Sequence, residues 1–452
     1  MIPTVILGAW ARRSAESIFS AINVIVFLCL DGLECILCMV YRFLDSFFEG
    51  EASSCYCVHD GEICDDGVRG DVPESEDELS ESLHGRKNVI RGMKILKSAR
   101  RRGIAAGPKK RVVGGGNGVS EGIPVRWSDC RCQACISWIN DKEQKLHIAV
   151  KESSMVSSDG MSPENVIFLH GFLSSSSLWT ELVFPNLSES VAAGHRLFAV
   201  DLLGFGKSPK PRDCFYTLRD HIEMIEKSVI SPFQLESFHI VAHSMGCVIA
   251  VALASKYHKS VKSVTLTASP YFPSAKGDPS LTALRTLAGK RMWPPQQFGT
   301  SVMSWYEHLG RCICFIICRN HRTWEMIIRL VTRRRDLYFP IIDFTRHTHH
   351  SAWHTMHNVL CGGMKLMDGY LETLRRSQVK IFVVHGDRDQ VVPLEHSIGI
   401  KLMVPDAVLN IIRGANHNSV IHGREREYVR FLERAWDPSS STSTKIRGCK
   451  AG

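Results

Sequence analysis

The chain has 452 residues, of which 44% are hydrophobic and 22% are charged, and its formal net charge is +9 at pH 7. This composition is typical of a globular protein and excludes both an intrinsically disordered chain and a polytopic membrane protein. Much of the charge lies in one stretch, where acids at 60–81 precede a basic run at 94–111. No aromatic residue interrupts that basic run, so we interpret the stretch as a solvated linker and expect no nucleic-acid partner.

Residues 1–50 contain the first predicted element, an apolar segment at 21–44 that follows a pair of arginines. The segment is long enough to span a bilayer, but Asp31 and Glu34 interrupt it, and each acid at mid-membrane depth would cost about 3 kcal/mol. Basic residues before an apolar run predict a signal peptide or signal anchor. We therefore expect a secreted or cell-wall protein, either cleaved or anchored at the cell surface. The alternative is a membrane-associated or buried helix that never crosses.

Residues 51–150 are predicted to form a polar linker that contains cysteine-bearing elements. Two groups of cysteines occur in it, namely Cys55, Cys57 and Cys64, and then Cys130, Cys132 and Cys135. Their C-x-C spacing differs from the paired C-x-x-C of zinc ribbons, so no metal site is predicted. Disulfides within or between the groups are expected if the compartment oxidises thiols.

From about Glu164 onward, short apolar runs alternate with helical segments. The runs that predict buried strands are NVIFLHG, HRLFAVDLLG, SFHIVAHS, VKSVTLTAS, VKIFVVHGD and AVLNIIRG. Such strands, separated by helices, predict an α/β fold with a mostly parallel sheet covered on both faces. The interval 270–376 is too long for one crossover and predicts an inserted helical cap. The cap would divide a core into residues 151–269 and 377–436, and a flexible tail would follow at 437–452.

The stretch FHIVAHSMGCVIAVALA begins as a strand and ends as a helix, with Ser244 at the corner between His243 and Met245. In a nucleophile elbow, a strained turn exposes the serine Oγ, and the residues two positions before and after must be small. Ala242 and Gly246 meet that requirement, although glycine is more usual at the first position. The pattern therefore predicts that Ser244 is a catalytic nucleophile.

A serine nucleophile needs a histidine base and a carboxylate that orients the base. Asp387 and Asp389 follow one late strand, and His417 follows the next. The order serine, acid, histidine is that of the α/β-hydrolases. We prefer Asp389, because a hydrophobic–proline pair after a G-x-x-D turn usually marks the second aspartate as the acid. Asp387, which could instead cap the turn, and His422 are the alternative acid and base.

Acyl transfer also requires two N–H donors directed at the developing oxyanion. The first expected donor is the backbone N–H of Met245, at the start of the helix. The second is the backbone N–H of Phe172, in the turn that follows His170 and Gly171.

Two further stretches were weighed as metal or cofactor sites. RHTHHSAWHTMHN holds five histidines, of which His350, His354 and His357 would share a helical face. It lacks the glutamate of H-E-x-x-H, so packing within the cap or pocket lining is expected rather than a metal. VDLLGFGKSP lacks the G-x-G-x-x-G spacing of a nucleotide-binding turn, and no cofactor is expected.

Several stretches together resemble the plant BODYGUARD family of α/β-hydrolase proteins. They are FLHGFLSSSSLWTE, LFAVDLLGFGKSPKP, FHIVAHSMG, SPYFP, NHRTWE and HTHHSAWHTMHN, and RWSDCRCQACISW before them. The resemblance covers about residues 164–436 and departs from the common pattern at Met245, where leucine is usual. It implies a lysophospholipase-like serine hydrolase of the epidermal cell wall, active in cutin or cuticle formation, with Ser244, Asp389 and His417 as the triad and a lipid or acyl ester as substrate. The alternatives are a cutin-polymerising acyltransferase on the same triad and a non-catalytic ligand receptor.

Overall fold

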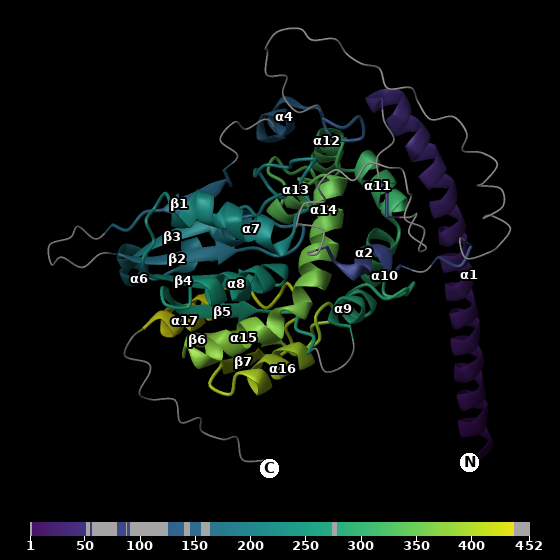
Figure 1. The fold of residues 1–452 in the computed structure, drawn as a ribbon. Coiled ribbons are helices and arrows are strands. Elements are labelled where there is room, and N and C mark those ends of the chain that lie inside the picture. The colour runs from purple at the N-terminus through teal and green to yellow at the C-terminus, as the bar shows by residue number, and fades with distance from the viewer. Residues whose placement is uncertain are drawn as a thin grey trace, which may run out of the picture.

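The computed structural model describes residues 2–50, 55–56, 79–86, 88–90, 125–139, 145–154, 163–273 and 278–437. Its centre is a seven-stranded sheet with the order β1-β3-β2-β4-β5-β6-β7 (Figure 1). The strands are β1 (Ile148–Lys151), β2 (Glu164–Leu169), β3 (His195–Val200), β4 (Phe238–His243), β5 (Val261–Thr267), β6 (Lys380–Gly386) and β7 (Val408–Ile412). Only β1 is antiparallel to its neighbour, so the predicted mostly parallel sheet is confirmed.

Apolar side chains cover both faces of the sheet, because successive residues of a strand point to opposite sides. In β2, Ile167 and Leu169 join one buried cluster, while Val166 and Phe168 join the other. The first cluster is covered by α7 (Leu218–Ile225), its continuation η3 (Glu226–Ile230), α8 (Met245–Lys256), α15 (Met367–Arg376) and α16 (Glu395–Met403). The second is covered by α5 (Ser177–Leu182), η2 (Phe184–Asn186), α6 (Glu189–Gly194) and α17 (Glu425–Trp436).

A group of helices is inserted between β5 and β6, where the sequence predicts a cap. They are α9 (Pro279–Leu287), α10 (Pro295–Trp305), α11 (Glu307–Ile316), α12 (His321–Thr332), α13 (Phe339–Phe344) and α14 (His349–Thr355), with η5 (Met356–Cys361) and η6 (Gly362–Lys365) continuing the last. Figure 1 shows them gathered at one end of the sheet. We propose that α9 to α14 form the cap, whereas α15 packs against α8 and contributes to the core.

The N-terminal segment forms a single helix, α1 (Ile2–Glu49), which lies alongside the cap helix α11 (Figure 1). Its acids Asp31, Glu34 and Asp45 are each at most 3% exposed. Their side-chain partners, in that order, are Lys290 at 3.0 Å, His308 at 2.9 Å and Arg311 at 2.6 Å. The acids that interrupt the apolar segment therefore bind this helix to the cap.

Two short helices precede the sheet in the region that the sequence presents as a linker. They are α2 (Glu81–His84) and α4 (Gln133–Ile139). Ser82 Oγ of α2 lies 2.8 Å from the Nδ1 atom of His357, and α4 lies next to α12 in Figure 1. Both helices thus lie against the cap.

Candidate active site

Ser244 occupies the sharp turn between β4 and α8. Its backbone angles are φ 53° and ψ −121°, a conformation that costs a non-glycine residue energy and that nucleophile elbows use to present Oγ. The turn is fixed by the Ser244 N–H, which donates to the carbonyl of Thr267 over 2.8 Å. A Cβ atom at Gly246 would lie 2.6 Å from the carbonyl oxygen of His170, and Ala242 is completely buried. Small residues at these two positions are therefore a steric requirement.

The structure brings Ser244, His417 and Asp389 into one chain of hydrogen bonds. His417 Nε2 lies 3.0 Å from Ser244 Oγ, and His417 Nδ1 lies 2.7 Å from Asp389 Oδ2. The three residues follow β4, β7 and β6, whose carboxyl ends meet at one edge of the parallel sheet. With the Nδ1–H donated to the carboxylate, Nε2 is free to accept the serine proton.

The carboxylate of Asp389 is fully buried and fully hydrogen-bonded. Its Oδ1 accepts the backbone N–H groups of Val391 and Val392, each over 2.9 Å. Burial alone would raise the pKa of Asp389, but hydrogen bonds from His385 and His417 and the N–H of Val392 hold this pKa well below its usual value. Asp389 is consequently ionised at neutral pH and able to stabilise a protonated His417.

The alternative acid and base lie in different surroundings. Asp387 is exposed and caps the turn that follows β7, accepting the N–H of Gly414 over 2.6 Å. His422 is exposed and lies 3.0 Å from the hydroxyl of Tyr338. Neither residue is within the hydrogen-bonded chain that joins Asp389 to Ser244.

Two buried histidines, His243 and His385, contact the residues of the triad. The Nε2–H of His243 donates to the backbone carbonyl of His417 over 3.1 Å, and burial lowers the pKa of His243 to about 3, so it remains neutral. His385 donates to the carbonyl of Val392 over 2.8 Å, and its Nδ1 accepts the hydroxyl of Ser397 over 2.6 Å. The elbow pattern includes His243, whereas no spacing marks His385 inside the run VKIFVVHGD.

The turn after β2 approaches Ser244 closely. A Cβ atom at Gly171 would lie 2.9 Å from His243 Nδ1 and 3.1 Å from Ser244 Cβ, so only glycine fits there. His170 joins this turn to the end of β3: its Nε2 accepts the N–H of Leu202 over 2.9 Å, and its Nδ1–H donates to the carbonyl of Gly171 over 2.7 Å. The turn is thus held beside the serine, with Phe172 as its next residue.

Met245 is the first residue of α8, so its N–H has no acceptor within its own helix. Phe172, the second expected donor, is partly buried, and its ring packs edge-on against Phe205 at 5.8 Å. Met245 directly follows Ser244 in the chain, and Phe172 directly follows Gly171, the residue that packs against Ser244.

The cap histidines pack against separate neighbours. His350 donates to the carbonyl of Cys214 over 2.8 Å, His354 Nε2 lies 2.9 Å from the hydroxyl of Tyr56, and His357 lies against α2. His350 and His354 also line a cavity of about 200 Å³ between α1 and the cap, which none of the triad residues lines. These are packing and pocket-lining contacts, whereas Nε2 of His347, in the same stretch, lies 3.6 Å from the sulfur of Cys314 and 3.5 Å from that of Cys318.

Comparison with known proteins adds sequence relationships to this geometry. Residues 164–304 match the family model described as the alpha/beta hydrolase fold. The chain is 48% identical over 434 residues to "Probable lysophospholipase BODYGUARD 4" of Arabidopsis thaliana, covering 95% of this chain and 99% of that protein. It is 39% identical over 463 residues to "Probable lysophospholipase BODYGUARD 1" of the same plant, covering 94% and 98% respectively.

Proposed function

Because the chain belongs to the plant BODYGUARD family of α/β-hydrolase proteins, we propose that it is a serine hydrolase that cleaves acyl esters of lipid-type substrates. The observation that carries the proposal is the unbroken hydrogen-bonded chain from Asp389 through His417 to Ser244. The family relationship supports the substrate class, since the relatives' names describe them as lysophospholipases.

In the proposed reaction, His417 Nε2 takes the proton of Ser244 as Oγ attacks the ester carbonyl. The negative charge that develops on the carbonyl oxygen is stabilised by the N–H groups of Met245 and Phe172. His417 then protonates the leaving alcohol, which leaves an acyl group on Ser244. Water activated by the same histidine releases the acid, while Asp389 remains ionised throughout.

An alcohol could replace water in the second step, which would make the protein an acyltransferase on the same triad. We propose hydrolysis as the primary activity and cutin or cuticle formation in the epidermal cell wall as its setting. A non-catalytic receptor would not require the strained backbone of Ser244, which serves to expose Oγ. Product analysis with a hydroxy fatty acid present distinguishes an acid product from a new ester.

The nucleophile is tested with a fluorophosphonate probe, which labels activated serines. The folded chain should be labelled, and Ser244→Ala should lose labelling and esterase activity by a factor on the order of 10⁴ or more. Ser174→Ala is a matched control, because Ser174 lies in the nearby turn after Phe172 and is assigned no role. Activity of Ser244→Ala within tenfold of the native chain would contradict the proposal.

We also propose that the protein enters the secretory pathway and that α1 lies along the surface of a membrane there. By length and composition, Glu16–Glu49 could cross a membrane. Crossing would remove the carboxylates from their partners on the cap, and cleavage would leave Arg311 buried without Asp45. A helix that stays in the protein and lies on the cap keeps these acids paired with their partners. Its outer side can then face lipid.

A further inference from the structure

We propose that Cys130, Cys132, Cys135 and His321 bind a structural zinc ion that fastens the segment 125–139 to the cap. These residues offer three sulfur atoms and one imidazole nitrogen, all within 4.8 Å of one another. The sequence predicts no metal here, because its C-x-C-x-x-C spacing is not that of a zinc ribbon. The fourth ligand lies 186 residues beyond Cys135, and only the fold brings it close.

The distances within this Cys₃His cluster match those around a tetrahedral zinc ion. His321 Nε2 lies 3.5 Å from Cys132 Sγ and 3.6 Å from Cys135 Sγ. Zinc bonds of about 2.3 Å to sulfur and about 2.0 Å to nitrogen, at tetrahedral angles, place sulfur and nitrogen about 3.5 Å apart. Three thiolates and one imidazole are also a common ligand set of structural zinc sites, which are closed to water.

His321 is held as a zinc-bound histidine is usually held. It is the first residue of α12 and is 5% exposed. Its other ring nitrogen, Nδ1, lies 3.1 Å from the carboxylate of Glu325, one turn further along the helix. A carboxylate that accepts the Nδ1–H fixes the tautomer in which Nε2 is free to bind the metal.

A disulfide accounts for this cluster less well. It would join two of the three sulfurs, leave the third as a lone thiol and give His321 no function. A zinc ion uses all four groups, and it also protects the sulfurs from oxidation in an oxidising compartment. The disulfides that the sequence suggests within this group are therefore the competing outcome of the test. Cys57 and Cys64 of the other group lie outside the described residues.

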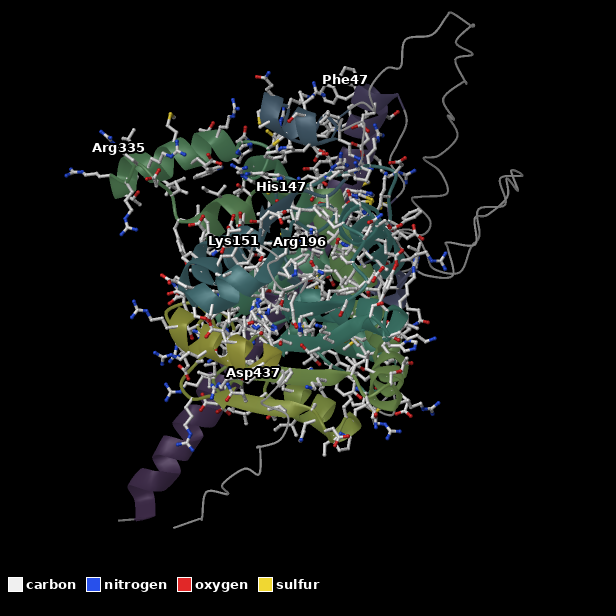
Figure 2. All side chains as sticks on the ribbon, turned by 90° about the vertical axis from the view of Figure 1, so that its left-hand side faces the viewer. Phe47, His147, Lys151, Arg196, Arg335 and Asp437 are labelled. Carbon is white, nitrogen blue, oxygen red and sulfur yellow. The ribbon has the colours of Figure 1, made fainter. Side chains whose placement is uncertain are left out.

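The position of the site indicates what the metal would do. Trp127, three residues before Cys130, donates its indole N–H to Asp45 of α1 over 2.7 Å. Ser128 accepts a hydrogen bond from Arg311 of α11, the same arginine that pairs with Asp45. Figure 2, in which Phe47 marks the end of α1, shows α1 and α4 close together at this end of the molecule. Zinc would thus join α1, the segment 125–139 and the cap into one unit.

Two further groups could also bind zinc, and their contribution must be separated in the experiment. They are Cys314, Cys318 and His347, and Cys38, Cys55 and His308, each with three ligand atoms. The full chain is purified with and without added Zn²⁺, and bound zinc is measured by elemental analysis. Cys132→Ser and His321→Ala should each lose one equivalent of zinc relative to the native chain. Cys318→Ser and Cys55→Ser, which alter only the other two groups, should retain that equivalent. So should Cys29→Ser, which removes an exposed thiol of α1 outside all three groups.

Co²⁺ provides a readout of the ligand set. Substituted into a chain that carries Cys318→Ser and Cys55→Ser, it should show the charge-transfer bands of tetrahedral thiolate coordination, and the added Cys132→Ser change should abolish them. Fluorophosphonate labelling of Ser244 shows that each variant still folds. A variant that keeps its zinc but is not labelled would count against the proposed function and not against the zinc site. Native zinc content in Cys132→Ser and His321→Ala, or a disulfide among the three cysteines in zinc-free folded protein, would overturn the proposal.

Discussion

Asp387 and Asp389 are separated by one residue, yet only the second has surroundings that suit a catalytic acid. The side chain of Asp389 is fully buried, accepts two backbone N–H groups and contacts His417 at 2.7 Å. Asp387 is exposed and bound to the N–H of Gly414. At the scale of the residue, therefore, burial and hydrogen bonding assign different roles to two identical side chains.

We expect Asp389→Asn to lower kcat by a factor on the order of 10⁴, because a neutral amide neither selects the required tautomer of His417 nor stabilises its protonated form. Asp387→Asn should remain within a few-fold of the native chain. Steady-state kinetics on a soluble ester, with circular dichroism to verify folding, measures both. If Asp387→Asn were the more damaging change, the acid would have to be reassigned.

The sequence predicts these residues because each lies directly after a strand, where parallel strands place their functional groups. It does not predict the support that His385 gives to Asp389, since that contact depends on how the turn after β6 folds back. The same limit applies to the metal ligands. Cys135 and His321 are distant in sequence, and no local pattern joins them.

At the scale of the element, the elbow depends on how closely α8 passes the end of β2. A Cβ atom at Gly246 would lie 2.6 Å from one backbone oxygen of that strand end and 2.7 Å from another. Backbone atoms cannot move aside as a flexible side chain can. The requirement for a small residue after the nucleophile is therefore a property of two packed elements.

Gly246→Ala should destabilise the fold by about 1–3 kcal/mol, the usual cost of overpacking a buried site, and should also impair labelling of Ser244. Urea unfolding followed by circular dichroism measures the change. Gly369→Ala is the matched control, because Gly369 lies in α15 with nothing within 4 Å of its would-be Cβ. There alanine should be neutral or slightly stabilising, as its helix propensity is higher. Equal stability of the two variants would argue against the close packing of α8.

Helix α1 illustrates what sequence patterns leave open at this scale. Its length and apolar content indicate a membrane segment, while its acids argue against one, and only their partners on the cap resolve the conflict. The opposite side of the helix exposes large apolar residues at helical spacing. They include Ile18, Ile22, Ile25, Leu33, Ile36, Met39, Phe43 and Phe47.

If this face contacts lipid, the double change Phe43→Ser and Phe47→Ser should weaken binding to phosphatidylcholine vesicles by about tenfold or more, since each ring contributes buried apolar area. Both rings are about 70% exposed, at 69% and 71%, so folding should be unaffected. Leu402→Ser on α16, where the leucine is 77% exposed, is the control and should bind as the native chain does. Vesicle flotation provides the measurement. Unchanged flotation of the double variant would exclude this face as the lipid contact.

For the whole molecule, the parallel sheet and the helices on both of its faces follow from local patterns, and the predicted α/β-hydrolase fold is confirmed. The buried strands are rich in apolar residues, and these runs are visible in the sequence. The exception is β1, whose four residues are too few and too little buried to be recognised. The docking of α1 on the cap could not be predicted, because ion pairs between residues more than 250 positions apart leave no periodic signal.

Ser244 is only 8% exposed and follows the carboxyl end of β4. Open α/β sheets bind their ligands outside the carboxyl ends of the strands, so we expect an ester to enter there, beside the helices inserted after β5. An acyl chain held there leaves water as it binds, and each buried methylene contributes about 0.8 kcal/mol.

We therefore expect kcat/KM for p-nitrophenyl esters to rise with acyl length, by at most about fourfold for each methylene that becomes buried. The series from acetate to long-chain esters is measured below the micelle concentration of each substrate, with Ser244→Ala as the background. A rise that continues to medium or long chains supports a lipid-type substrate. Equal rates along the series, or a preference for acetate, would remove that substrate class while leaving the serine hydrolase itself intact, because the triad acts on the ester carbonyl whatever the length of the chain.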